Sequence, residues 1–352
     1  MNISETYFQS AIKKFDQVYK SAGDAVDFCF NIANQIVRIK FTTRRMAAVL
    51  TPALWHLLAN NSAGEQLTIC CCDSVTSGVD FPDPPWSAKD YTQRGDIRGV
   101  NEGGLKTAFD TRSGALSMFD TKEKVALYWV HNCNDLPSYE KGAPFLFIFN
   151  MGLSNYERQL IHGAAVGYSN GGVLLVGRAH SGKSMTALSC LGSELYYAAD
   201  DYCLMGNGNV PYVFNLYCSA TLLPEDMDKF AALKPALDTV NISQTDRAVY
   251  FLTRTHPHKI INGFPLKFIL IARVGRNTQT LVSPARPVEA LKALAPFTMV
   301  QLPTAGQQTL QTIANIIKKV PCFSIELGTE ISQIPSIIEG LLRKYNLNLC
   351  IP

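Results

Sequence analysis

The feature that most constrains this chain is the segment 177–184, which reads Gly-Arg-Ala-His-Ser-Gly-Lys-Ser. It fits the Gly-x-x-x-x-Gly-Lys-Ser pattern of a phosphate-binding loop. The two glycines let the backbone turn so that successive N–H groups face a phosphate chain. Lys183 brings a positive charge to that chain, and the Ser184 hydroxyl is a ligand for Mg²⁺. The segment therefore predicts a site for a nucleoside triphosphate. The expected nucleotide-contacting residues are Gly177, Arg178, Ala179, His180, Ser181, Gly182, Lys183, Ser184 and Met185.

The flanking sequence supplies the strand and the helix that such a loop requires. Residues 172–176 form a short apolar run typical of a strand buried on both faces. Residues 183–191 are expected to form a helix whose positive end faces the same anion. A second apolar run, 195–199, leads into Asp200 and Asp201, at a strand end where a magnesium-holding carboxylate belongs. Together these features favour nucleotide binding over a glycine-rich turn beside a solvated acidic pair.

Three residue pairs surround the motif at informative distances. A His-Gly pair stands at 162–163, one strand before the loop, an Ala-Leu pair at 187–188, and an Asp-Asp pair at 200–201. In these pairs and the motif, residues 162–201 resemble the core of the HPr kinase/phosphorylase superfamily. That superfamily is the serine-kinase branch of the phosphoenolpyruvate-carboxykinase-like P-loop fold. A weaker similarity to HPr-kinase-like proteins extends over most of the chain.

The resemblance implies specific roles. Lys183 and Ser184 would hold the phosphates of ATP and Mg²⁺, and the two aspartates would divide metal binding and general-base work between them. Because an alcohol is a weak nucleophile at neutral pH, a carboxylate that accepts its proton assists the transfer. We assign Asp200 as the base and Asp201 as a metal ligand, and the reverse division remains open. His162 would lie near the transferred phosphoryl group. The alternative is a buried structural histidine whose ring nitrogens are hydrogen-bonded within the core.

The chain also departs from the family pattern. HPr kinase carries a Glu-containing segment after its Asp pair that is associated with the phosphorylase reaction. The corresponding region here, 213–221, contains no Glu, and the next one is Glu225. This argues against dephosphorylation and against HPr as the substrate. Within the loop, Arg178 and His180 replace small residues. Each is either a phosphate contact or a solvent-facing side chain.

The expected fold class is α/β, a mixed-sheet P-loop core of the HPr kinase/carboxykinase type preceded by an N-terminal α+β lobe. We place the N-terminal lobe at 1–142 and the kinase-like domain with its C-terminal helices at 143–352. The predicted helices are 5–19, 48–58, 144–155 (packed against the kinase core), 224–240, 288–295, 308–319 and 331–345. The predicted strands outside the motif are 36–41, 67–72, 115–120 paired with 125–130, 268–274 and 320–327.

Other residues are candidates for substrate handling. The breaker-rich segment 81–91 is either a substrate flap or an ordinary connection between lobes. Arg247 and Arg254 are either extra positive charge for phosphoryl transfer or solvated charges. His256 and His258 either flank an acceptor site or lie in a surface turn.

Bulk properties fit a cytoplasmic enzyme. The chain has 352 residues, 47% of them hydrophobic, which is ample for a substantial core. A net charge of +3 does not suggest nucleic acid as a partner, and no apolar stretch is long enough for a membrane span. The ten cysteines lack the paired spacing of a zinc site, and we expect reduced, mostly buried thiols. Cys70, Cys71 and Cys72 would alternate faces on a strand.

The predicted function is an ATP- and Mg²⁺-dependent kinase that transfers the γ-phosphoryl group to a hydroxyl, with a serine of a peptide or protein as the expected acceptor. A small-molecule alcohol is an alternative acceptor. An ATP hydrolase and a non-enzymatic nucleotide sensor are alternative functions, although a pure sensor does not need a base. Related enzymes form homo-oligomers, an assembly that the resemblance makes an option for this chain. We expect neither nucleic acid nor membrane as a partner.

Overall fold

The computed structural model describes residues 3–60, 64–101, 103–155, 157–238 and 247–347. The chain forms two compact units. The first contains Met1–Leu153 together with Val300–Thr304, and the second contains Ser154–Met299 and Ala305–Pro352. The sequence boundary at 142/143 therefore differs from this division, because residues 143–153 and a short returning segment belong to the first unit. Both units mix helices with mixed sheets, as the α/β expectation requires.

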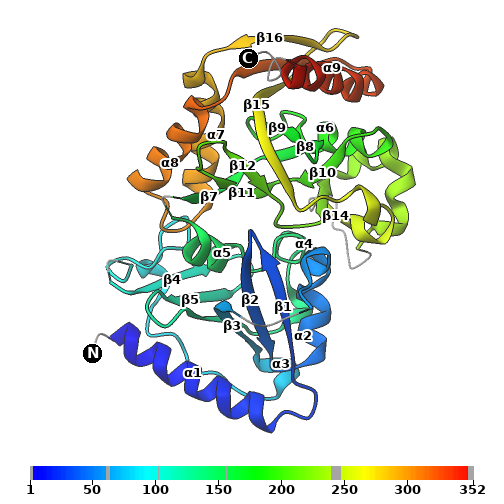
Figure 1. The fold of residues 1–352 in the computed structure, drawn as a ribbon. Coiled ribbons are helices and arrows are strands. Elements are labelled where there is room, and N and C mark those ends of the chain that lie inside the picture. The colour runs from blue at the N-terminus through cyan, green and yellow to red at the C-terminus, as the bar shows by residue number, and fades with distance from the viewer. Residues whose placement is uncertain (1–2, 61–63, 102, 156, 239–246, 348–352) are drawn as a thin grey trace. The chain divides into compact units, whose positions relative to one another are not determined.

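The first unit is built on a six-stranded mixed sheet with the strand order β1-β2-β3-β6-β5-β4 (Figure 1). Strands β2, β3 and β6 are parallel neighbours, and the other pairs are antiparallel. Its elements, with η for a 3₁₀-helix, are α1 Ile3–Ser21, β1 Val26–Ile32, β2 Gln35–Phe41, α2 Arg44–Leu50, η1 Pro52–Leu57, β3 Glu65–Asp73, α3 Ser74–Ser77, η2 Ala88–Asp90, β4 Leu105–Asp110, β5 Ala115–Asp120, β6 Val125–Val130, η3 Cys133–Asp135, α4 Ser138–Gly142 and α5 Leu146–Leu153.

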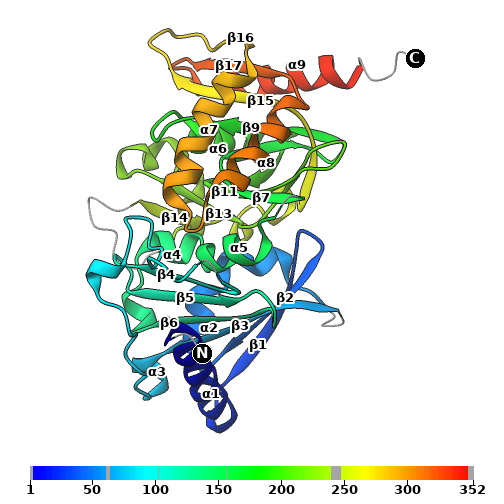
Figure 2. The ribbon, with the colours of Figure 1, turned by 90° about the vertical axis from the view of Figure 1, so that its left-hand side faces the viewer.

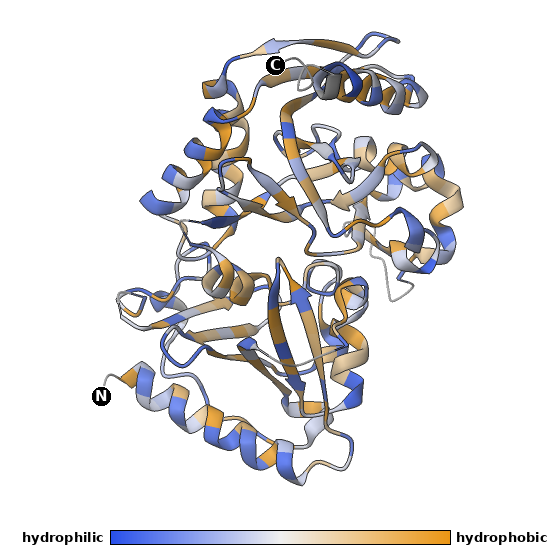
Figure 3. Cartoon of the chain, viewed as in Figure 1, coloured by the Kyte–Doolittle hydropathy of each residue, from blue (hydrophilic) through white to orange (hydrophobic). Residues whose placement is uncertain are grey.

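Helix α1 covers one face of this sheet. Its buried residues recur every three or four positions, so one stripe of the helix is apolar, and Figure 3 shows hydrophobic and hydrophilic residues alternating along it. That stripe packs with Cys70 and Cys72 of β3, whereas Cys71 is buried on the opposite face. The expected alternation of the three cysteines is confirmed. Burial raises the pKa of the Cys70 thiol to about 12.

Two helix predictions in this unit need correction. The helix expected over 48–58 is two elements, because Pro52 has no N–H to continue the hydrogen-bond ladder of α2 and instead opens the 3₁₀-helix η1. The helix expected over 144–155 is the shorter α5, Leu146–Leu153, which belongs to the first unit and packs on the first sheet. A Cβ atom on Gly152 would lie 3.3 Å from Leu67 and 3.6 Å from Phe119, so the absence of a side chain there allows this close packing.

The second unit contains a nine-stranded mixed sheet and the two-stranded sheet β13-β14. The strand path of the large sheet is β10-β8-β9-β15-β12-β11-β7, and β17 and β16 continue it beside β15. Its elements are β7 Arg158–His162, β8 Ala164–Tyr168, β9 Gly171–Val176, α6 Lys183–Ser189, η4 Cys190–Gly192, β10 Tyr196–Ala199, β11 Tyr202–Gly206, β12 Tyr212–Phe214, β13 Ser219–Leu222, η5 Pro224–Ala236, β14 Ala248–Phe251, η6 Leu252–Arg254, η7 Pro257–Lys259, β15 Gly263–Val274, β16 Leu281–Ala285, α7 Pro287–Gln301, α8 Gln307–Lys318, β17 Cys322–Leu327, η8 Ile331–Gln333 and α9 Ile334–Leu347.

Strand β9 is fully buried because helices cover both faces of its sheet. Val173 and Leu175 point into the core formed with α6 and α9. Leu174 and Val176 point into the core formed with α7 and α8, which lie side by side in Figure 2. A strand with two covered faces reads as a continuous apolar run, which is why 172–176 was recognisable from sequence.

The large sheet folds back on itself at one corner. In a flat sheet β10 and β11 would lie about 24 Å apart, at about 4.8 Å for each strand spacing along the observed order. Only Asp200 and Asp201 connect them, and the three peptide units from Ala199 to Tyr202 span at most about 11 Å. Strands β7 and β8 are likewise joined by Gly163 alone, whose N–H donates to the carbonyl oxygen of Asp201 at 2.8 Å. The Asp pair therefore lies at the corner.

The remaining helices of the second unit follow the expectations with shifted ends. Helix α6 stops at Ser189 and continues as η4, and α7 runs on to Gln301 past Pro296. The helix expected over 224–240 is the 3₁₀-helix η5, interrupted at Phe230 (φ −126°), and its last expected residues lie outside the described ones. Among the residues described, the structure contains no helix whose length and apolar character would suit a membrane span.

Candidate functional site

The segment 177–182 connects the end of β9 to the first residue of α6. Its backbone takes angles that glycine adopts readily, with φ of +157° at Gly177 and +90° at Gly182. A Cβ atom on Gly182 would lie 2.3 Å from Cδ1 of Leu327, and one on Gly177 would lie 2.8 Å from the carbonyl oxygen of Ala272. Conformation and the close approach of neighbouring strands therefore both require glycine here.

Lys183 is buried at the start of α6. Its ammonium group donates hydrogen bonds of 3.1 Å to the carbonyl oxygens of Gly177 and Arg178, so the side chain folds back over the loop. Burial lowers the pKa of Lys183, and the charges of Asp201 and Asp200 oppose that shift. The lysine thus lies within the electrostatic range of both the loop and the Asp pair.

The tip of the loop is exposed. Arg178, Ala179 and His180 face solvent, whereas Ser181 is buried and Met185 half-buried. His180 has a φ of +60°, a left-handed conformation that costs a non-glycine residue about 1 kcal/mol or more. The Ser181 hydroxyl has no hydrogen-bond partner among the described residues.

Ser184 and Asp200 are joined directly. The Ser184 hydroxyl donates to Oδ1 of Asp200 at 2.8 Å, and the backbone N–H of Asp201 donates to the same oxygen at 3.1 Å. Oδ2 of Asp200 accepts from the backbone N–H of Thr221 at 3.2 Å. Asp200 is only 3% exposed, so both oxygens of a buried carboxyl group are satisfied by neighbouring donors.

Asp201, next to Asp200 in the chain, lies in a more exposed environment. It is half-buried and has a φ of +64°, which turns the chain at the corner of the sheet. Its Oδ2 accepts a hydrogen bond of 2.9 Å from the hydroxyl of Thr221, and that hydroxyl in turn accepts one of 3.1 Å from the guanidinium group of Arg247.

The charge balance of the pair is set by burial. Burial raises the pKa of Asp200 to about 7, and the neighbouring charge of Asp201 acts in the same direction. The hydrogen bonds from Ser184 and Thr221 and the charge of Lys183 act against this rise. With a pKa of about 7, the Asp200 carboxyl group is partly protonated near neutral pH.

His162 reaches the same corner through its backbone. It pairs with Tyr202 in the β7–β11 ladder, and its N–H donates to the hydroxyl of Thr298 at 3.2 Å. Its ring packs edge-on against Tyr202, with centroids 5.3 Å apart, and lies 6.0 Å from the ring of Phe297. This aromatic setting suits a core histidine as well as a catalytic one.

Other sequence candidates lie elsewhere. Arg254 donates to the carbonyl oxygen of Leu237 and lies over the ring of Phe251. The rings of His256 and His258 are 6.4 Å apart on the short turn around η7. The segment 81–91 belongs to the first unit, where its Trp86 packs against Tyr7.

The residues at the corner fit a magnesium–nucleotide complex. The Ser184 hydroxyl and the two carboxylates offer oxygen ligands of the kind that Mg²⁺ prefers. The buried Ser181 hydroxyl could donate a hydrogen bond to a phosphate oxygen. Within the described ranges, no group of three or more His, Cys, Asp or Glu side chains is arranged to hold a metal. The donor set matches an ion that is bound by one or two carboxylates and otherwise by phosphate and water.

Thr221 is a site residue that the sequence does not reveal. It lies 20 positions after Asp201 in the short strand β13, with no motif to mark it. It reaches the Asp pair because the Tyr197 hydroxyl donates to the carbonyl oxygen of Ser219 at 2.5 Å, which ties β10 to β13. Arg247 is a candidate from the sequence on charge alone, and the β13–β14 pairing places it diagonally across from Thr221.

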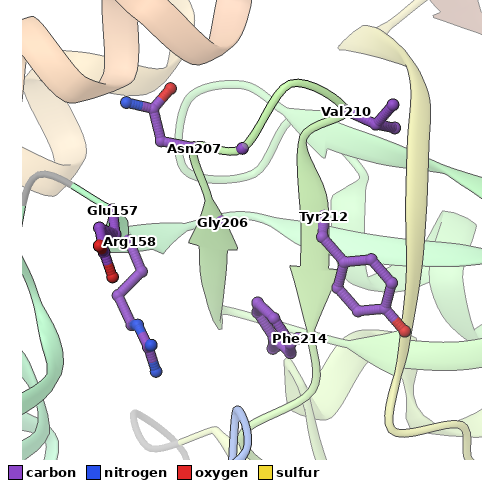
Figure 4. Close-up of a pocket in the computed structure, with 8 residues that line it drawn as sticks. Glu157, Arg158, Gly206, Asn207, Val210, Tyr212 and Phe214 are labelled. Atoms are coloured by element: carbon purple, nitrogen blue, oxygen red, sulfur yellow. The ribbon is translucent and has the colours of Figure 1, made fainter.

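The second unit also has an open cavity of about 480 Å³ (Figure 4). It lies at the start of β7 and along the β11–β12 hairpin, at the other end of these strands from His162 and Asp201. It contains none of the residues predicted for the site. Its lining residues are Glu157, Arg158, Gly206, Asn207, Gly208, Val210, Tyr212 and Phe214.

Comparison with known proteins identifies no family. No protein-family model matches the chain, and no curated protein matches it. A solved structure that resembles it is the Hpr(Ser) kinase/phosphatase from Coxiella burnetii, at 13% identity and a TM-score of 0.30, covering 54% of this chain and 98% of that chain. A likeness this distant assigns no activity.

Proposed function

We propose that the chain is an ATP- and Mg²⁺-dependent kinase that transfers the γ-phosphoryl group to the hydroxyl of a serine in a peptide or protein. The observation that supports it best is the contact between the motif and the Asp pair. The hydroxyl of Ser184, the last residue of the motif, lies 2.8 Å from Asp200, and Asp201 stands beside it with a less enclosed carboxylate. Two carboxylates beside a phosphate-binding loop supply both functions that transfer to an alcohol requires.

We assign the roles from the hydrogen bonds. Asp200 is buried and engaged with Ser184, so these two oxygens would hold Mg²⁺, which when bound neutralises charge on the phosphates. Asp201, half-buried, would accept the proton of the acceptor hydroxyl while that oxygen bonds to the γ-phosphorus and the bond to ADP breaks. Lys183 would bind the β- and γ-phosphates. This reverses the division that we favoured from sequence, where Asp200 is the base.

The raised pKa of Asp200 favours the assignment made from sequence, with Asp200 as the base and Asp201 as the metal ligand. A pKa of about 7 at Asp200 suits a general base that works near neutral pH. The variants Asp200→Asn and Asp201→Asn separate the two assignments. If Asp201 is the base, Asp201→Asn retains Mg²⁺-dependent ATP binding and loses about 10²-fold or more in transfer. Asp200→Asn then loses the Mg²⁺ dependence of binding. The opposite pattern would restore Asp200 as the base.

The activity itself is tested with γ-labelled ATP, Mg²⁺ and a cell extract separated into protein, peptide and small-molecule fractions, with Lys183→Ala as the blank. Label on a protein or peptide serine supports the proposal and identifies the acceptor class. Label on a small molecule would retain the chemistry and change the substrate. Release of free phosphate alone would indicate a hydrolase, and ATP that is bound without being consumed would indicate a sensor.

A further inference from the structure

Thr221 contacts both carboxylates of the Asp pair with different atoms. Its backbone N–H donates to Oδ2 of Asp200 at 3.2 Å, and its hydroxyl donates to Oδ2 of Asp201 at 2.9 Å. The side chain is 9% exposed, so water competes little for these groups. One residue thereby holds two adjacent carboxylates at defined positions relative to each other.

The same hydroxyl connects Asp201 to a cation. The guanidinium group of Arg247 donates to the Thr221 oxygen at 3.1 Å. A hydroxyl has a single proton, and here the proton points to Asp201 while the oxygen lone pair receives Arg247. The chain of donors therefore has one direction, from the guanidinium through the hydroxyl to the carboxylate, and each bond polarises the next.

Strand pairing brings these groups together. Thr221 of β13 faces Val249 of β14, and Arg247 lies two positions before Val249, diagonally across from Thr221, where its long side chain reaches the Thr221 hydroxyl. Strand β13 also contacts α6, the helix that begins with Lys183. Lys183 and Arg247 are near enough for the charge of Arg247 to lower the pKa of Lys183. Two cations thus lie near the Asp pair. Lys183 is hydrogen-bonded to the loop and acts on the carboxylates through its charge, and Arg247 is linked to Asp201 through Thr221.

We propose that Thr221 is a positioning residue for phosphoryl transfer, whose hydroxyl couples Arg247 to Asp201 and whose backbone N–H holds Asp200 in place. This inference rests on the proposed kinase function. It assigns no contact between Thr221 and substrate. It makes Thr221 the link through which a cation outside the motif acts on the carboxylate that receives the acceptor proton.

The test is a double-mutant cycle on the full chain with Thr221→Val, Arg247→Ala and their combination. Valine preserves the shape of threonine and removes only the hydroxyl. We expect Thr221→Val to lower kcat for transfer by about 10- to 100-fold, the loss expected from a hydrogen bond to a charged group, while the Kd of a fluorescent ATP analogue changes less than about threefold. Thr221→Ser keeps the hydroxyl and should restore kcat to within about fivefold of the wild type.

Coupling is the decisive readout. In the Arg247→Ala background the further effect of Thr221→Val should shrink below about threefold, because the link has already lost its cation. Thr312→Val removes a buried hydroxyl in α8, outside the site, and should leave kcat and ATP binding unchanged. Melting temperatures of all variants separate loss of folding from loss of function. If Thr221→Val does not fold, two other variants test the same link. Arg247→Ala removes the guanidinium group that donates to the Thr221 hydroxyl, and Thr221→Ser retains that hydroxyl.

Three results would overturn the inference: full kcat in Thr221→Val, a serine variant as impaired as the valine variant, or independent effects of the two substitutions in the cycle. Each of these leaves the kinase function standing, since the wild type still transfers phosphate. A wild type that transfers no label to any acceptor overturns the proposed function and this inference together. The two failures are therefore distinguishable in one set of assays.

Discussion

The hydroxyl of Ser184 and Oδ1 of Asp200 lie 2.8 Å apart, joining the first turn of α6 to the corner between β10 and β11. The two residues are 16 positions apart, and the strand β10 returns the chain from the end of α6 to its beginning. This contact brings a motif that is recognisable from sequence together with an acidic pair whose position depends on the sheet.

Removing the Ser184 hydroxyl should impair transfer without unfolding the protein. Ser184→Ala deletes one oxygen ligand and leaves Oδ1 of Asp200 with one donor fewer. We expect the transfer rate to fall about tenfold or more and the Mg²⁺ concentration for half-maximal rate to rise. Ser189→Ala, in the last turn of the same helix, removes a hydroxyl that donates to the carbonyl oxygen of Thr186, away from the Asp pair, and is the matched control. Equal rates for the two variants would contradict the site assignment.

Lys183→Ala should weaken nucleotide binding. Its buried ammonium group donates to two carbonyl oxygens of the loop, and it would contact phosphate oxygens in the complex. We expect the Kd for ATP to rise by about 10-fold or more, the typical loss of a charge-assisted hydrogen bond, in a fluorescence titration. Lys318→Ala changes an exposed lysine of α8 and should bind ATP as the wild type does. Unchanged affinity in Lys183→Ala would refute the phosphate-binding role.

Gly182→Ala should destabilise the loop. The residue has a φ of +90°, and a Cβ atom would lie 2.3 Å from Cδ1 of Leu327. Strain and the displaced leucine together should lower the free energy of unfolding by about 1–3 kcal/mol and weaken ATP binding. Gly192→Ala is the matched control, because no atom lies within 4 Å of its added Cβ. Urea unfolding of both variants measures the difference, and similar stabilities would show that the loop tolerates a side chain.

The stability of the protein should fall between about pH 4.5 and 7 because of Glu140. Burial raises its pKa from 4.5 to about 7, and the charge of Asp110 adds to the rise. The folded state therefore binds the proton more tightly than the unfolded state. This contribution is complete below pH 4.5 and is lost as the pH rises through 7, amounting to about 3 kcal/mol at most.

Glu140→Gln should remove this part of the pH dependence, because glutamine stays neutral and can still accept the hydrogen bond of the Tyr128 hydroxyl. Denaturant unfolding at pH 5 and pH 8 measures the difference for the wild type and the variant. Glu123→Gln alters an exposed glutamate of the same unit and should follow the wild type. A wild-type pH dependence in Glu140→Gln would mean that another group is responsible.

The local elements around the motif were predictable because their causes are local. Continuous apolar residues at 172–176 indicate a strand covered on both faces, and the glycines of 177–182 indicate a turn with positive φ. The helix that follows and the strand before Asp200 appear where the pattern places them. The prediction of one helix over 48–58 was wrong because it followed the apolar periodicity across Pro52. Proline has no N–H to donate to the preceding turn, so the α-helix ends before it.

What the sequence by itself determined was the phosphate-binding motif with its strand and helix, and the presence of an Asp pair at a strand end. Tertiary structure decided what each carboxylate contacts. The folded corner brings Ser184 into contact with Asp200. The pairing of β13 with β14 brings Thr221 and Arg247 to the same corner from 20 or more residues further along the chain. Such contacts depend on which strands become neighbours and on how the sheet bends. The free energy that favours one strand arrangement over another comes from packing throughout the core, so no short segment of sequence reveals it.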